Sequence, residues 1–296
     1  MPVQHEFGGP WTQDKLRCVQ EYLSAHRRIF TINPGARYFR TVYVDAFAGT
    51  GYRLEPRRSY RRGVPFPELT EPEVEGWFKG SAYKALEVDP PFDRYVFIER
   101  NPERVQELQS LKGEFPDRAE RITIVQEDAN TYLREWCQRM DWKRWRAVVF
   151  LDPYGMQVEW SLIEAIAKTR AIDLWLLFPL GQAVNRLLTR NEPPPPEWAR
   201  ALTRIFGTED WQREFYKSET TITLFGEEQL QRKEADFDSI GRYFVGRLKT
   251  LFAEVAENPR PLRNSKGIPL YLLCFAVGNP KGAPTAIKIA QYLLES

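Results

Sequence analysis

The sequence predicts an α/β protein built on a doubly wound, mostly parallel β-sheet. Five short apolar runs alternate with helix-like segments at the spacing of successive β-α-β units. Each run is nearly continuously apolar, which is typical of parallel strands buried on both faces. A further apolar run near the C-terminus follows a turn sequence and indicates an antiparallel hairpin strand.

The five expected strands alternate with four expected helices. The strands are TVYVDAF (41–47), RYVFIE (94–99), RITIVQED (121–128), AVVFLDP (147–153) and DLWLLFP (173–179). The helices cover the region around 80–88, NPERVQELQSLK (101–112), ANTYLREWCQR (129–139) and EWSLIEAIAK (159–168). This order favours a single sheet with helices on both faces.

Four more elements complete the predicted fold. An amphipathic helix over 11–30 opens the chain, with Thr12 as its N-cap. Residues 237–252 form a helix with one apolar stripe, which we assign to the core. The segments 254–262 and 268–277 flank a turn at 264–267 and predict the hairpin, and a helix over 285–295 follows it.

We interpret residues 1–296 as one domain with two insertions. Residues 52–79 interrupt the first strand–helix connection, and an unstructured insertion of that length is usually functional or mobile. Residues 181–235 contain a four-proline run, a Trp-rich helix near 197–216 and a polar stretch. We expect this second insertion to lie on the surface without a core of its own.

The composition is that of a folded protein with no strong charge bias. Hydrophobic residues make up 43% of the 296 residues, and the formal net charge is +2, which neither demands nor excludes a nucleic-acid partner. Three widely spaced cysteines and two histidines argue against a zinc site and suit a reducing compartment. No signal peptide or membrane span is evident, so we expect a cytoplasmic protein.

Acidic residues follow four of the expected strands, at the sheet edge where α/β proteins bind ligands. The first strand ends in VDAFAGTG. The cofactor-binding candidates here are Asp45, Phe47, Ala48, Gly49 and Gly51. The glycines allow a tight turn and close approach of a ligand to the backbone. The stretch lacks the GxGxxG of a dinucleotide site, which favours S-adenosyl-L-methionine; a simple glycine turn is the alternative.

The next two strand ends add further candidates for cofactor binding. Glu99 is placed to accept hydrogen bonds from ribose hydroxyls, although it also begins a helix N-cap region. Asp128 and Ala129 follow the third strand, where a carboxylate can accept a hydrogen bond from the adenine amino group. Asp128 is also a suitable helix N-cap, and the two roles are compatible.

The fourth strand ends in Asp152-Pro153-Tyr154-Gly155, the candidate catalytic element. An exocyclic base amine is a poor nucleophile because its lone pair is delocalised into the ring. Hydrogen bonds to the Asp152 carboxylate and the Pro153 carbonyl would draw that nitrogen toward sp³ character, and Tyr154 would stack on the base. The base must leave its own stack to reach such a pocket. A simple turn at the strand end is the alternative.

An arginine cluster in the first insertion is the candidate for substrate binding. Arg57, Arg58, Arg61 and Arg62 are suited to contacts with phosphates. The alternative is a solvated surface loop.

At these residues the sequence resembles a class I, Rossmann-like S-adenosyl-L-methionine-dependent methyltransferase. More closely, it resembles the three-Cys-motif partner protein (TcmP) family. The matching stretches are YVDAFAGTG, GSAYKALE, VFIE, VFLDPYG, DLWLLFP and PLYLLCFAVGNP. The resemblance implies the methyltransferase fold and a partner protein that carries the three cysteines of the family's name. DPYG is also similar to the D-P-P-Y of adenine-N6 methyltransferases and the D-P-F-G of tRNA guanine-N2 dimethyltransferases.

Three functional hypotheses follow. The first is a methyltransferase that modifies an exocyclic amine of RNA or DNA through DPYG. The second is a non-catalytic cofactor-binding scaffold for a three-Cys-motif protein, in which Trp175, Trp198 and Trp211 contribute to an interface or, alternatively, pack in the core. The third is a small-molecule or protein methyltransferase with the same cofactor site.

Overall fold

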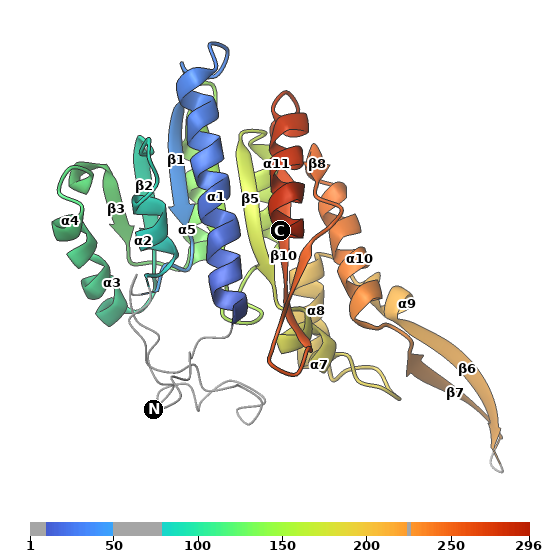
Figure 1. The fold of residues 1–296 in the computed structure, drawn as a ribbon. Helices are drawn as coiled ribbons and strands as arrows, with labels where there is room; N and C mark the ends of the chain where they lie inside the picture. The colour runs from blue at the N-terminus through green and yellow to red at the C-terminus, as the bar shows by residue number, and fades with distance from the viewer. Residues whose placement is uncertain (1–9, 50–78, 224–225) are drawn as a thin grey trace, which may run out of the picture.

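A mixed β-sheet forms the centre of the molecule in the computed structural model, which describes residues 10–49, 79–223 and 226–296 (Figure 1). Within these residues the sheet has eight strands. They are β1 (Arg40–Asp45), β2 (Arg94–Ile98), β3 (Ile122–Val125), β4 (Trp145–Leu151), β5 (Ile172–Phe178), β8 (Glu254–Val255), β9 (Arg260–Arg263) and β10 (Pro269–Val277).

The strand order is β3-β2-β1-β4-β5-β10-β8, with β9 paired to β10. The first five strands are parallel, and β10 is antiparallel to β5, β8 and β9. The order 3-2-1-4-5 is that of a doubly wound Rossmann sheet, in which ligands bind where the strand order reverses. The fold is therefore Rossmann-like, and the antiparallel C-terminal strand is confirmed.

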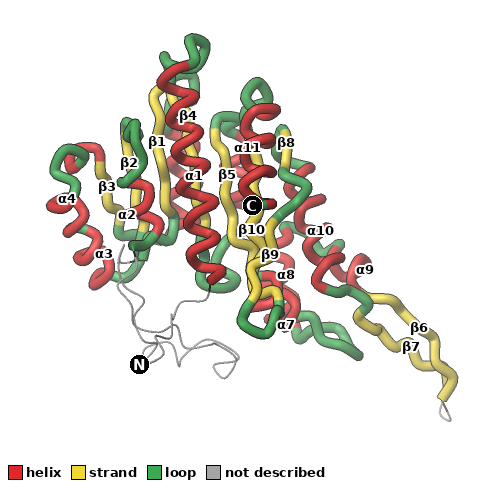
Figure 2. Tube along the Cα trace, in the orientation of Figure 1, coloured by secondary structure: helices red, strands yellow, loops and turns green. Residues whose placement is uncertain are grey.

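Helices cover both faces of the sheet (Figure 2). One face carries α1 (Pro10–Ile32), α2 (Ser81–Leu86), α3 (Pro102–Leu108), α4 (Ser110–Glu114) and α11 (Ala283–Glu295). The other carries α5 (Ala129–Arg139), α6 (Trp160–Lys168), α8 (Pro196–Phe206) and α10 (Phe237–Lys249). A short 3₁₀ turn, η2 (Ala119–Arg121), precedes β3. Successive strand residues alternate between the two cores: Val42 and Val44 face one, Tyr43 the other.

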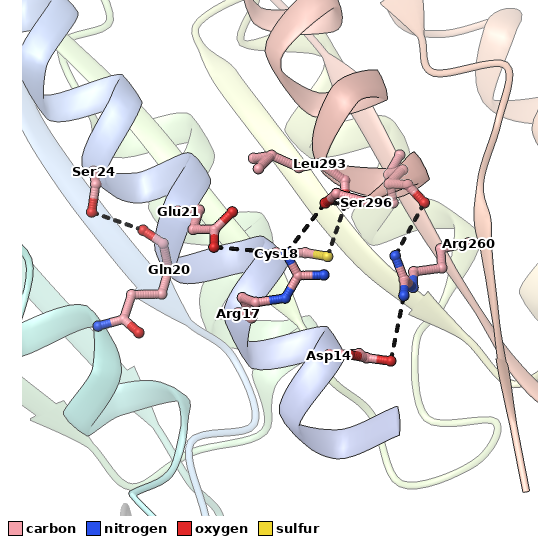
Figure 3. A network of polar contacts seen from close by, with 10 residues as sticks. Asp14, Arg17, Cys18, Gln20, Glu21, Ser24, Arg260, Leu293 and Ser296 are labelled. Carbon is pink, nitrogen blue, oxygen red and sulfur yellow. Dashed lines mark hydrogen bonds and ion pairs between the residues drawn. The ribbon is translucent and has the colours of Figure 1, made fainter. Parts of the chain in front are cut away.

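The long helix α1 is anchored to the C-terminal part of the chain (Figure 3). The Cys18 thiol donates to the carbonyl of Leu293 at 3.2 Å, and Arg17 donates to the Ser296 hydroxyl at 3.2 Å. Asp14 forms an ion pair with Arg260 at 3.4 Å. These contacts hold α1 beside α11 and fix which of its side chains face the sheet.

The segment between β5 and α10 combines packed helices with a projecting hairpin. Its elements are η3 (Leu180–Val184), α7 (Asn185–Leu187), α8, α9 (Trp211–Phe215), β6 (Tyr216–Thr223) and β7 (Gly226–Lys233). Phe206, Trp211 and Phe215 are buried in the same core cluster as the sheet residues. The antiparallel pair β6–β7 extends away from the main sheet (Figure 1).

Most expected elements are confirmed, and four details are wrong. Thr12 does not cap α1, because the helix already begins at Pro10. The helix expected near 197–216 is two helices, since Gly207 adopts a left-handed conformation with φ +71°. The helix at 101–112 divides into α3 and α4 at Gln109. The strand expected over 254–262 is two strands, β8 and β9, that pair with different stretches of β10.

Other expectations concern the cysteines and membrane spans. Cys18, Cys137 and Cys274 are free and buried. Among the described residues, no helix is long and apolar enough to cross a membrane.

A buried carboxyl group lies beneath α1, at the amino end of β5. The Tyr22 hydroxyl donates to Asp173 Oδ2 at 2.6 Å, and His26 Nε2 lies 4.0 Å from the same oxygen. Burial raises the pKa of Asp173 to about 6, against the lowering effects of Tyr22 and Arg146. Burial also lowers the pKa of His26 to about 3, so this imidazole is neutral at physiological pH.

We expect Asp173→Asn to gain stability relative to the natural protein as pH rises. The pKa of Asp173 is higher in the folded state than in the unfolded state. The stability that this residue contributes is therefore fully present below the unfolded pKa, and it is lost as the pH rises through about 6. Between about pH 4.5 and 7.5 the difference in unfolding free energy should grow by about 2 kcal/mol in favour of Asp173→Asn. Denaturant unfolding measures it, with Asp117→Asn, an exposed acid, as control. A pH-independent difference would contradict this assignment.

Candidate functional site

Two acidic side chains meet at the carboxyl edge of the sheet. Asp45 ends β1 and lies opposite Phe150 of β4, its parallel neighbour. Asp152 follows Phe150 by two residues and so shares its face of the sheet. Asp45 is fully buried, whereas the Asp152 side chain is 21% exposed. The register thus brings together the first and fourth acids predicted from the strand ends.

Lys15 of α1 completes this pair and was not predicted from the sequence. Its ammonium donates to Asp152 Oδ2 at 2.6 Å, and the side chain is only 8% exposed. The ammonium also lies 5.4 Å from the centre of the Trp11 ring. One sequence signal was available: Lys15 lies on the same helical stripe as Val19 and Tyr22, which are apolar core residues.

The electrostatics of the site centre on Asp45. Burial raises the pKa of its carboxyl group to about 7. The negative charge of Asp152 raises this pKa further, whereas hydrogen bonds from Ser81 and the Phe47 backbone, together with the charge of Lys15, lower it. The carboxyl group of Asp45 therefore gains or loses its proton near neutral pH. A cation bound beside it would lower its pKa and favour the ionised form.

The turn after β1 holds the backbone against β2. The Phe47 amide donates to Asp45 Oδ1 at 3.4 Å, and the Ala48 amide donates to the Ile98 carbonyl at 3.0 Å. Gly49 has φ +60°, and within the described part of the chain no heavy atom lies within 4 Å of the position its Cβ would take. The left-handed backbone explains the glycine, and a ligand can approach the backbone here. Gly51 lies outside the described residues.

Glu99 follows β2 at the same edge of the sheet. Its Oε1 accepts from the Asn101 amide at 2.8 Å, and Oε2 lies 3.9 Å from Arg104. The N-cap of α3 is Asn101, whose side chain accepts from the amides of Glu103 and Arg104. Glu99 therefore does not cap the helix itself, and its role as a ribose acceptor stays a prediction.

Asp128 and Ala129 follow β3. Asp128 caps α5, with Oδ1 accepting from the Thr131 amide at 3.1 Å, so the capping role considered for it is realised. Ala129 is buried. The next residue, Asn130, was not predicted as a site residue. Its side chain donates to the Gln157 carbonyl at 2.9 Å and accepts from the Glu159 amide at 3.0 Å, and so links the first turn of α5 to the loop after β4.

The DPYG segment forms the turn that follows β4. Pro153 is buried, and Gly155 has φ +74°. The Tyr154 amide donates to Gln157 Oε1 at 2.7 Å, and the residue is 41% exposed. The turn therefore presents an aromatic side chain at the surface directly after the partly exposed Asp152. Together with Asn130, Gln157 holds the backbone of this turn in place.

The remaining predictions concern phosphate and metal sites. Arg57, Arg58, Arg61 and Arg62 lie outside the described residues. Among the residues that the structure describes, no group of three or more His, Cys, Asp and Glu side chains is arranged to hold a metal ion.

Comparisons with known proteins give distant similarities. No protein-family model matches the chain. No curated protein matches it either. Similar solved structures include protein LPL1258 from Legionella pneumophila str. Philadelphia 1, at 13% identity over 97% of this chain and 92% of that chain, with a TM-score of 0.46.

Two enzymes are among the other similar structures. Spermidine synthase from Thermotoga maritima is 9% identical over 92% of this chain and 60% of its own, with a TM-score of 0.39. A methyltransferase from Geobacter sulfurreducens is 12% identical over 74% of this chain and 88% of its own, with a TM-score of 0.28. Because the TM-scores of all three structures are below 0.5, these likenesses carry no inference about substrate or mechanism.

We expect Lys15 and Asp152 to be energetically coupled. Lys15→Met should destabilise the protein by about 2 kcal/mol at neutral pH, because it leaves Asp152 without its cation beside the buried Asp45. Adding Asp152→Asn should restore about half of that loss, since the unpaired charge is gone. These values allow for the partial exposure of Asp152.

Chemical denaturation of the two single variants and the double variant measures this coupling. The exposed ion pair of Lys249 and Glu257, 2.8 Å apart, is the matched control, and its cycle should show no measurable coupling because solvent screens both charges. Strict additivity at Lys15 and Asp152 would contradict the expectation.

Proposed function

We propose that this chain is an S-adenosyl-L-methionine-dependent methyltransferase that modifies an exocyclic amine of a nucleic-acid base. The observation that carries the proposal is the position of Asp152 at the carboxyl edge of β4. Its carboxylate is partly exposed, already accepts a hydrogen bond from a nitrogen, and is followed directly by the exposed Tyr154. An amine-directed methyltransferase needs such an acceptor beside a stacking ring.

The residues at the carboxyl edge fit the cofactor. Asp45, Asp152 and Lys15 together carry one net negative charge when both acids are ionised, and a sulfonium ion would neutralise it. Among the described residues, none approaches the position that a Cβ of Gly49 would take, which leaves the turn backbone accessible to a ligand. We assign the cofactor to the turn of Asp45, Phe47, Ala48, Gly49 and Gly51, with further contacts from Glu99, Asp128 and Ala129. The cofactor supplies an electrophilic methyl group.

The residues after β4 bind and orient the amine. Asp152 accepts a hydrogen bond from the amine and so increases the electron density on nitrogen, while the Pro153 carbonyl accepts the second N–H. The ammonium of Lys15 must leave Oδ2 or share it, because it occupies the acceptor at 2.6 Å. Tyr154 stacks on the base. Asp152 would take the proton that the nitrogen loses on receiving the methyl group, whose bond to the sulfonium sulfur breaks and leaves S-adenosylhomocysteine.

Several finer assignments belong to the same proposal. The stretches that resemble the TcmP family include the ends of β1 and β4, which supports membership of that family and a three-Cys-motif partner protein. The three free, buried cysteines support a reducing, cytoplasmic location. Arg57, Arg58, Arg61 and Arg62 are proposed to contact the phosphates of the substrate.

Methyl transfer into nucleic acid should depend on Asp152. With labelled S-adenosyl-L-methionine and RNA, DNA or protein from the host, we expect label to enter a nucleic-acid pool. Asp152→Ala should lower that rate by at least about 100-fold, because it removes the acceptor that activates the amine. Asp141→Ala, at an exposed acid, is the control.

Three results would contradict this proposal. Undiminished transfer with Asp152→Ala would remove Asp152 from the mechanism. Cofactor binding without transfer to any pool would instead favour the non-catalytic scaffold, and label in protein or small molecules would favour the third hypothesis.

Asp45 should make cofactor discrimination depend on pH. S-adenosyl-L-methionine carries a sulfonium charge that S-adenosylhomocysteine lacks. Because the pKa of Asp45 is about 7, its carboxyl group is largely neutral at about pH 6 and ionised at about pH 8. We expect the affinity ratio of the charged to the uncharged ligand to rise roughly fivefold over this range.

Calorimetric titration of both ligands at the two pH values measures this ratio. The asparagine of Asp45→Asn is neutral at both pH values. This variant should therefore lack the part of the increase in affinity ratio that comes from ionisation of Asp45. A ratio with the same pH dependence in both proteins would contradict the assignment of Asp45 to the sulfonium.

A further inference from the structure

A cluster of arginines and aromatic rings lies at the amino ends of β1, β2 and β4, the edge of the sheet opposite Asp45 and Asp152. Trp145, the first residue of β4, is buried. The guanidinium groups of Arg40 and Arg94 lie 5.8 Å and 4.8 Å from the centre of its ring. Arg40 and Arg94 are the exposed first residues of β1 and β2. One indole thus supports two exposed cations.

The same edge carries a third arginine, Arg146, which lies against a pair of aromatic rings. The guanidinium of Arg146 lies 3.6 Å from the centre of the Phe39 ring and donates to the carbonyls of Trp142 and Trp145, each at 2.7 Å. The Phe39 ring packs on Tyr38 at 4.1 Å between centroids, and Tyr38 is 68% exposed. The two groups lie on different faces at one edge of the sheet, since Trp145 packs in one core and Phe39 contacts Phe30 of α1. We call their six residues the arginine–aromatic surface: Tyr38, Phe39, Arg40, Arg94, Trp145 and Arg146.

Arg40 and Arg94 carry positive charge that no carboxylate of the described residues pairs with, whereas the charge of Arg146 acts on the buried Asp173 and lowers its pKa. Within the described part of the chain, Arg40, Arg94 and Arg146 form no ion pair with any carboxylate. Asp93, next to Arg94 in sequence, accepts from the amide and hydroxyl of Thr41 instead, at 2.7 Å and 2.9 Å.

We propose that the arginine–aromatic surface binds single-stranded nucleic acid. The guanidinium groups of Arg40 and Arg94 lie against a ring face, which leaves their N–H donors for bidentate contacts with phosphate and reduces the side-chain entropy lost on binding. The exposed Tyr38 ring, at the same edge of the sheet, offers a stacking face to an unpaired base. Unpaired cations interleaved with an exposed aromatic ring are the combination by which proteins bind single strands without reading their sequence.

The surface is separate from the proposed methyl-transfer site. Arg40 and Asp45 are the two ends of β1 and are five residues apart, a length of about 17 Å. Phosphates bound at Arg40 and Arg94 therefore belong to a different stretch of the polymer from the base at Asp152. Binding at the surface stands by itself, and only the identification of the bound strand with the methylated substrate rests on the proposed function.

The test measures binding rather than methyl transfer. A labelled single-stranded RNA of about 20 nucleotides and its duplex are titrated with the full chain by fluorescence anisotropy at several salt concentrations. We expect Arg40→Gln with Arg94→Gln to weaken single-strand binding by at least about tenfold and to reduce the salt slope by about 1.4. The same two positions changed to Lys should keep most of the slope, because the charges remain.

A matched control removes the same charge elsewhere. Arg139 and Arg213 are exposed and each pairs with an acid, Glu135 and Asp210 respectively. Arg139→Gln with Arg213→Gln should change affinity by less than about twofold. Tyr38→Ala should weaken binding about tenfold without changing the salt slope, whereas Tyr38→Phe should retain it, because stacking needs only the ring. Thermal unfolding confirms that each variant is folded.

Three outcomes would overturn the inference. Loss of binding in the Arg139 and Arg213 variant equal to that in the Arg40 and Arg94 variant would mean that net charge, not this surface, binds RNA. Tighter binding of the duplex would exclude single-strand recognition. Poly-glutamate that binds as tightly, with the same dependence on Tyr38, would identify an acidic protein as the partner. Because transfer is assayed separately through Asp152, failure of either proposal leaves the other intact.

Discussion

The ion pair between Lys15 and Asp152 joins the first helix of the chain to the turn after the central strand β4. A buried pair is maintained only when both partners are held in good geometry, because desolvation of the charges opposes their attraction. The structure supplies that constraint from both sides. Helix α1 is fixed through Asp14, Arg17 and Cys18, and the turn after β4 is fixed through Asn130 and Gln157.

The charges of the molecule separate between the two edges of its sheet. At the carboxyl edge, the described residues bring two acids, Asp45 and Asp152, together with one cation, Lys15, so this group can accept positive charge. At the amino edge, Arg40 and Arg94 lie on Trp145 without neutralising acids among the described residues. A formal net charge of +2 conceals this separation. Charge distribution, rather than net charge, therefore decides which ligands each edge can attract.

The tryptophans bear on the choice between an enzyme and a scaffold. Trp175 and Trp211 are fully buried, and Trp198 packs against the core, so these rings stabilise the fold rather than form an exposed interface. A scaffold would need another surface for its partner. The exposed aromatic at the proposed site is Tyr154, beside Asp152, which suits the recognition of a flat substrate better than the burial of a large protein interface.

Much of the fold could be predicted from the sequence, because strands buried on both faces are continuously apolar and helices carry a periodic stripe. The alternation of elements also placed Asp45, Glu99, Asp128 and Asp152 at one edge of the sheet, since parallel strands all end there. Only the tertiary structure decided which of these acids share a face and which cation meets them. The pairing of Asp45 with Phe150 in the sheet determines that Asp45 and Asp152 share a face. The packing of α1 across the sheet brings Lys15 to Asp152, which is 137 residues away in sequence. Local periodicity carries no information about such a contact, because it depends on register and on how the helix is anchored.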